Sequence, residues 1–168
     1  MKILVAGVGN IFLGDDGFGV EVVHRMSDVD LPAHVTVADY GIRGMHLAHD
    51  LAGAGYDLTI LVDATQRGDP PGTVSVVDLD RSVVDVSLLD AHGMQPDAVL
   101  GLVHVLGGDV GRVLLVGCEP GDLDHGMDLS PPVAAAVDTA VRVAVDLATK
   151  YPFESDEELT CALASLAK

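Results

Sequence analysis

The sequence is poor in the residues that mark several common classes of protein. Its 168 residues include no tryptophan, two cysteines, and nine lysines and arginines against 26 aspartates and glutamates. The cysteines, Cys118 and Cys161, provide neither a disulfide framework nor a metal-ligand spacing. The formal net charge of −17 repels nucleic-acid phosphates and anionic membrane surfaces. We therefore expect neither a nucleic acid nor a membrane as a partner.

Long hydrophobic runs are also missing, although 49% of the residues are hydrophobic. No apolar stretch approaches the roughly 20 residues that cross a bilayer. The short apolar stretch after Lys2 is followed by Gly9, Asn10 and then two aspartates, where a signal peptide would have a small-residue cleavage site. We therefore predict a cytoplasmic protein.

The chain instead alternates short apolar runs with segments of helical period. Strands are predicted at 2–8, 35–38, 58–62, 73–79 (a sheet edge) and 113–117, and helices from about residue 17, at 45–54, at 96–106 and after Ser130. Such alternation indicates an α/β fold in which helices cover both faces of a mostly parallel sheet. We predict one domain, 1–150, and a tail, 151–168, that is either helical or partly disordered.

Acids follow three of the predicted strands. Ligands bind at the carboxyl ends of the strands in such folds, and Asp15, Asp16, Asp39 and Asp63 all fall there. Structural roles are available for each, as a helix cap or a turn bond. Two successive acids, Asp15 and Asp16, exceed what a cap needs, so cation binding is a competing interpretation. A carboxylate directly after a buried strand, such as Asp63, needs a partner, which could be a metal, a proton or helix-terminal amides.

A dinucleotide-dependent oxidoreductase is one alternative, because Gly7 and Gly9 follow the first strand. The third glycine of a dinucleotide fingerprint would fall at Phe12, however. Asp15 and Asp16 would also repel a pyrophosphate. Both observations disfavour this alternative.

A histidine completes a possible metal site. His92 precedes the helix predicted at 96–106 and can therefore reach the edge that carries the acids. Asp16, Asp63 and His92 could hold a borderline divalent ion and leave positions open for water or substrate. A non-enzymatic metal or small-ligand binding module on this fold is a further alternative. A serine or cysteine nucleophile is unsupported, since no Gly-x-Ser-x-Gly elbow is present and Cys118 has no evident base.

Several short motifs occur in a distinctive order along residues 1–150. They are Ile3–Asn10 with Asp15–Val20, Asp39 with Gly41, Gly44 and Met45, Val62–Ala64, Ala91–Gly93, Gly117–Pro120 and Leu129–Pro131. Together they resemble the hydrogenase maturation protease family. The resemblance implies a three-layer sandwich around a twisted five-stranded sheet, and an aspartyl-type endopeptidase.

The resemblance also implies a substrate and a set of site residues. The substrate is the precursor of a nickel–iron hydrogenase large subunit, which loses a C-terminal extension after nickel insertion. By motif position, Asp16, Asp63 and His92 are the expected metal-contacting and catalytic residues, with Asp39 a further candidate. Many members have Glu where this chain has Asp16. We expect the nickel to arrive with the substrate, other divalent ions to substitute for it in vitro, and the protein to act as a monomer.

Overall fold

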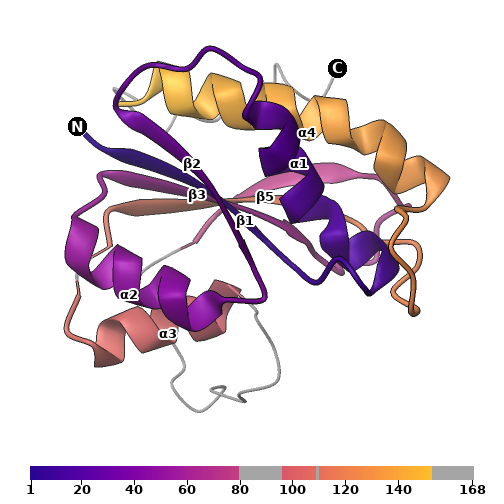
Figure 1. Cartoon of the computed structure of the whole chain (residues 1–168), viewed down its shortest axis with the longest axis horizontal. Coiled ribbons are helices and arrows are strands. Elements are labelled where there is room, and N and C mark those ends of the chain that lie inside the picture. The colour runs from indigo at the N-terminus through magenta and orange to yellow at the C-terminus, as the bar shows by residue number, and fades with distance from the viewer. Residues whose placement is uncertain (80–95, 109, 153–168) are drawn as a thin grey trace.

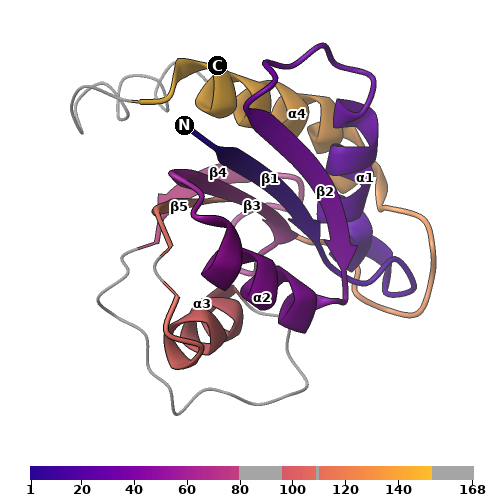
Figure 2. The same cartoon turned by 60° about the vertical axis from the view of Figure 1, so that its left-hand side comes forward.

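A twisted five-stranded sheet separates two layers of helices in the computed structural model, which describes residues 1–79, 96–108 and 110–152 (Figures 1 and 2). The strand order is β2-β1-β3-β5-β4, and only β4 is antiparallel to its neighbour. The predicted α/β sandwich with a mostly parallel sheet is therefore confirmed. The strands are β1 (Ile3–Val8), β2 (Val35–Gly41), β3 (Leu58–Ala64), β4 (Val74–Asp78) and β5 (Arg112–Cys118).

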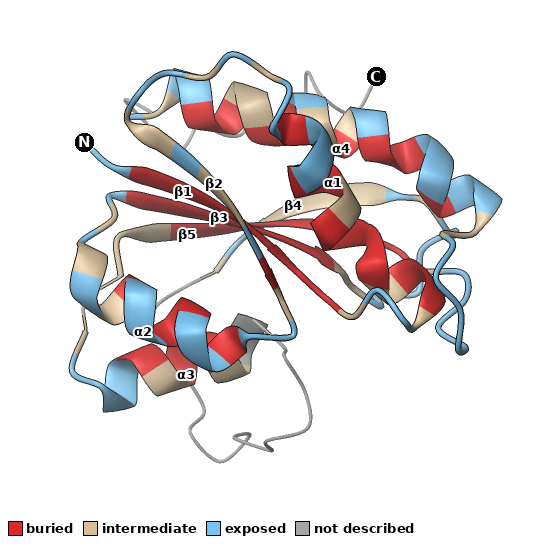
Figure 3. Cartoon of the chain, viewed as in Figure 1, coloured by how far each residue is buried: buried red, intermediate tan, exposed pale blue. Residues whose placement is uncertain are grey.

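The central strands are buried on both faces (Figure 3). Successive side chains of a strand point to opposite faces, so Ile3 and Val5 pack in one cluster while Leu4 and Ala6 pack in the other. This double burial explains why the strands read as uninterrupted apolar runs. The first cluster lies under α1 (Phe18–Met26) and α4 (Pro131–Lys150), and the second under α2 (Gly44–Ala54) and α3 (Pro96–Val105).

None of the helices in the described ranges combines the length and apolar character that a bilayer crossing requires. The last of them, α4, ends at Lys150, where the predicted domain ends. The prediction for the tail, 151–168, concerns residues that lie outside the described part of the chain from 153 onward.

Strand β3 is longer than predicted. The apolar run ends at Val62, but pairing with β5 continues, with Asp63 opposite Gly117 and Ala64 opposite Cys118. Asp63 is therefore part of the strand rather than the first residue after it.

The start of α4 lacks the usual side-chain cap. Ser130 is the N-cap residue, but its side chain makes no cap hydrogen bond. Pro131 and Pro132 follow it, and proline has no N–H for a cap to accept. The Ser130 hydroxyl instead donates to Asp15 Oδ2 at 2.8 Å.

The topology places a switch point at the carboxyl edge of the sheet. From β1 the chain passes through α1 on one face to β2, and it returns through α2 on the other face to β3 (Figure 1). The strand order therefore reverses between β1 and β3, and ligands of such sheets bind at this switch point. Asp16 follows β1 and Asp63 lies near the end of β3, so both acids lie at the switch point.

Helix α1 approaches the sheet so closely that only glycine fits at position 19. An added Cβ on Gly19 would lie 2.1 Å from the Val62 carbonyl oxygen and 2.4 Å from that of Val8. Gly19→Ala is expected to lower the free energy of unfolding by about 3 kcal/mol, because backbone must move to admit the methyl group. Gly53→Ala is the matched control: Gly53 has open space around it in α2 and should gain roughly 0.5 kcal/mol. Equal urea midpoints for the two variants would contradict the packing described here.

Candidate active site

Two carboxylates lie together at the switch point. Asp16 belongs to the 3₁₀ turn Gly14–Gly17, is half-buried, and accepts the Asn10 N–H at 2.7 Å. Asp63 is only 8% exposed. Gly9 lies between them with φ 126°, and an added Cβ there would be 1.8 Å from the Asp16 carbonyl oxygen and 3.7 Å from Asp63 Oδ1. A side chain at position 9 would therefore displace the loop that carries Asp16 and enter the space beside Asp63.

The electrostatics of Asp63 follow from this arrangement. Burial raises the pKa of Asp63 well above the ordinary value, the negative charge of Asp16 raises it further, and the Ala64 N–H lowers it only in part. An acid at the end of an apolar run is expected near solvent, and this expectation is wrong for Asp63, because β3 continues past Val62 and buries it. Two carboxylates in such proximity are stabilised by a proton or a cation between them.

The third predicted site residue, His92, lies outside the described residues. Within the ranges that the structure does describe, no group of three or more His, Cys, Asp or Glu side chains is placed to hold a metal ion. Asp16 and Asp63 offer carboxylate oxygens to a cation. A divalent cation bound there would offset the repulsion that raises the pKa of Asp63. The pair therefore fits a cation chemically but needs further ligands, from His92 or from the substrate.

Asp15, the neighbour of Asp16, has a structural role. Its fully buried carboxylate accepts four hydrogen bonds, from the N–H groups of Gly121, Asp122 and Ser130 and from the Ser130 hydroxyl, at 2.6–2.8 Å. Burial alone would raise the pKa of Asp15, but the bonds from Ser130, Gly121 and Asp122 outweigh burial and lower it. Asp15 thus anchors the loop 119–130. This role is neither the helix cap nor the cation ligand that the sequence suggested.

Glu119 is a buried acid that the sequence analysis did not single out. It follows β5, is 9% exposed, and its Oε2 accepts the Arg67 N–H at 2.7 Å. This bond ties the loop after β3 to the end of β5. The signal that drew attention to Asp63, an acid just after an apolar strand, is equally present at Glu119.

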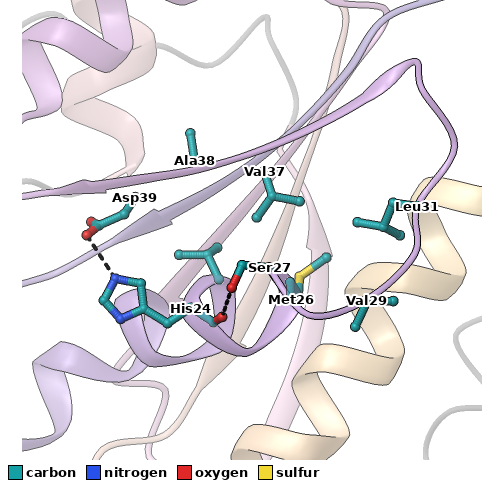
Figure 4. A pocket seen from close by; sticks show the side chains of 9 residues that line it. His24, Met26, Ser27, Val29, Leu31, Val37, Ala38 and Asp39 are labelled. Carbon is teal, nitrogen blue, oxygen red and sulfur yellow. Dashed lines mark hydrogen bonds and ion pairs between the residues drawn. The ribbon is translucent and has the colours of Figure 1, made fainter.

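Asp39 pairs with a histidine of α1. Its Oδ2 lies 3.2 Å from His24 Nε2 (Figure 4). The two residues border a pocket of about 310 Å³ between α1 and β2, whose other lining side chains are mostly apolar. Asp39, the further candidate for the site, therefore borders this pocket. The apolar lining is Val23, Met26, Val29, Leu31, Val37 and Ala38.

Cys118 is not an available nucleophile. The side chain is fully buried in the core at the end of β5. Burial, together with the charges of Asp15 and Glu119, raises the pKa of its thiol to about 12. Because the thiolate is the reactive form, the structure supports the absence of a cysteine nucleophile at this position.

The fold and this edge define an α/β protein with a carboxylate pair at the switch point of the sheet, where ligands of such folds bind. A model of the hydrogenase maturation protease family (HycI) matches residues 20–147. The hydrogenase expression/formation protein HupD of Rhizobium leguminosarum bv. viciae is 36% identical over 150 residues, which cover 84% of this chain and 73% of that protein. HupD of Rhodobacter capsulatus is 34% identical over 148 residues, which cover 86% and 70%.

Solved structures of hydrogenase maturation peptidases are also similar to this chain. The E. coli hydrogenase maturating endopeptidase HybD has a TM-score of 0.73 at 31% identity, covering 90% of this chain and 94% of that one. A hydrogenase 2 maturation peptidase from a Thaumarchaeota archaeon has a TM-score of 0.69 at 35% identity, covering 88% and 97%. The chain belongs to the hydrogenase maturation protease family and is therefore an endopeptidase by class, which argues against the dinucleotide-dependent alternative.

Proposed function

We propose that this protein removes a C-terminal extension from the precursor of a nickel–iron hydrogenase large subunit once nickel has been inserted. Family membership supports the substrate class. The observation that carries the proposal is the close pair of Asp16 and Asp63 at the switch point, where ligands of such sheets bind.

Nickel enters this account as part of the substrate. Asp16, Asp63 and His92 contact the nickel that the precursor holds, since two carboxylates and an imidazole are suitable ligands for a borderline divalent ion. Without a cation, Asp63 faces the charge of Asp16 in a buried place. A loaded precursor relieves that repulsion and an unloaded one does not, so the pair can distinguish the two. Other divalent ions that prefer the same kinds of ligand should substitute for nickel in vitro.

The carboxylates also supply the proton chemistry of an aspartyl-type endopeptidase. Peptide hydrolysis needs a group that takes a proton from the attacking water and returns it to the leaving amine. A carboxylate of the pair can take and return that proton. Asp39, directed at His24, is left out of this step.

A non-enzymatic binding module is the second candidate, because a carboxylate pair can bind a metal without catalysis. Incubation of the purified protein with nickel-loaded and nickel-free precursor separates the two. A protease shortens the loaded precursor and leaves the nickel-free one intact. A binding module forms a complex with the loaded precursor and leaves its length unchanged, and that result would overturn the proposal.

A further inference from the structure

Exposed apolar side chains concentrate around the candidate site. The described part of the chain has nine exposed large apolar residues, and six of them lie at the carboxyl edge of the sheet, five on loops and one in the first turn of α2. Isolated apolar residues on a surface are ordinary, whereas a cluster of them marks an interaction site. The six residues, called here the apolar rim, are Ile11, Phe12, Ile42, Met45, Leu123 and Met127.

The backbone holds two loops of the apolar rim together. The Gly126 N–H donates to the Phe12 carbonyl at 3.0 Å, and the Gly14 N–H donates to the Gly126 carbonyl at 2.8 Å. Asp15 adds its bonds to the same loop, 119–130. Phe12 and Met127, 59% and 67% exposed, therefore stand on a fixed platform, and docking there costs little ordering of the backbone.

The third loop of the apolar rim adjoins the same site. The Gly9 N–H donates to the Gly41 carbonyl at 3.1 Å, which places Ile42 beside the glycine that separates Asp16 from Asp63. The strand order β2-β1-β3 puts this loop on the opposite side of Asp63 from the loop that follows β5. The apolar rim therefore flanks the carboxylate pair on both sides.

Carboxylates border the apolar rim. Asp122, Asp124 and Asp128 are exposed in the loop that carries Leu123 and Met127. A second copy of this chain would bring the same acids against them, and an anionic membrane would be repelled as well. A protein whose apolar contact surface is bordered by lysine or arginine is complementary to both features.

We infer that the apolar rim docks an apolar surface, bordered by basic side chains, on the hydrogenase precursor next to the segment to be cut. This inference rests on the proposed function, because it takes the precursor as the partner. It adds that docking of the precursor uses side chains outside the carboxylate pair and that this docking step does not depend on nickel.

Equilibrium binding of nickel-free precursor, which the protease does not cut under the proposed function, tests the docking alone. Phe12→Ser/Met127→Ser should weaken its dissociation constant about tenfold or more. The matched control is Val105→Ser/Leu106→Ser at the end of α3, next to the amino end of β5, where the side chains are 60% and 52% exposed. The control should bind as the wild type does, and thermal unfolding of both variants should be unchanged.

The charge component has its own variant. Asp124→Asn/Asp128→Asn should weaken binding and reduce its dependence on salt concentration. Equal dissociation constants for the Phe12→Ser/Met127→Ser variant and the control would overturn the inference, as would no measurable binding by the wild type. Cleavage of nickel-loaded precursor by the wild type, measured in parallel, reports on the proposed function separately.

Discussion

Asp63→Asn is expected to abolish precursor processing while leaving the protein folded. The substitution keeps the shape of the side chain but removes a carboxylate that contacts nickel. His92→Ala should have the same effect on processing. Asp16→Glu should be tolerated, since the resemblance admits the longer acid there. Cleavage of nickel-loaded precursor measures all three, with Asp28→Asn, an exposed acid near the end of α1, as the control.

Asp63→Asn should also raise the stability of the fold, by an amount that depends on pH. The pKa of Asp63 is higher in the folded than in the unfolded protein, so the native state binds the extra proton and is destabilised as pH rises above about 4. Asp63→Asn should therefore be more stable than wild type by roughly 1 kcal/mol near pH 8, and the difference should shrink toward pH 4. Full activity of both Asp63→Asn and His92→Ala would contradict the assignment of these residues to the site. Global unfolding of Asp63→Asn would contradict the description of Asp63 as a destabilising acid.

Asp15→Asn is expected to cause a large loss of stability. An amide cannot accept all four hydrogen bonds that the carboxylate accepts, and its NH₂ group would face a donor. The loss should be about 2–4 kcal/mol, or about 5–15 °C in Tm for a protein of this size. Asp128→Asn, an exposed acid of the same loop, should change stability by less than about 0.5 kcal/mol.

The pH dependence of the Asp15 effect has the opposite sign to that of Asp63. The folded pKa of Asp15 lies below its unfolded value. Its contribution is therefore complete above about pH 4 and is lost as pH falls through the folded pKa. The stability difference between wild type and Asp15→Asn should be constant near neutral pH and should diminish below pH 4. Wild-type stability in Asp15→Asn at pH 7 would contradict the anchoring role.

The layers of the fold could be predicted because burial leaves a local record in the sequence. Residues 3–8 are covered on both faces and form one apolar run, while 73–79 alternates because β4 lies at the sheet edge. The location of the candidate site also follows from the sequence, since parallel strands end at one edge. Asp16 and Asp63 meet there because β1 and β3 are neighbours.

The separate roles of the acids could not be predicted, because each depends on a partner far along the chain. Asp15 and Asp16 are adjacent in the sequence, yet Asp15 is bound by residues 106 to 115 positions away. Asp63 is buried because β3 pairs with β5 beyond the apolar run. Asp39 pairs with His24, a contact set by the packing of α1 beside β2. The spacing of acids along a chain carries none of this information.

The intact mass of the large subunit, followed as nickel occupancy of its precursor is varied, tests the central claim most directly. The precursor is loaded to several known nickel contents, incubated with the wild-type protein, and weighed by mass spectrometry. The account predicts that the fraction shortened by the C-terminal extension rises in proportion to the nickel content. An unchanged mass at full loading, or equal shortening of loaded and nickel-free precursor, would contradict it.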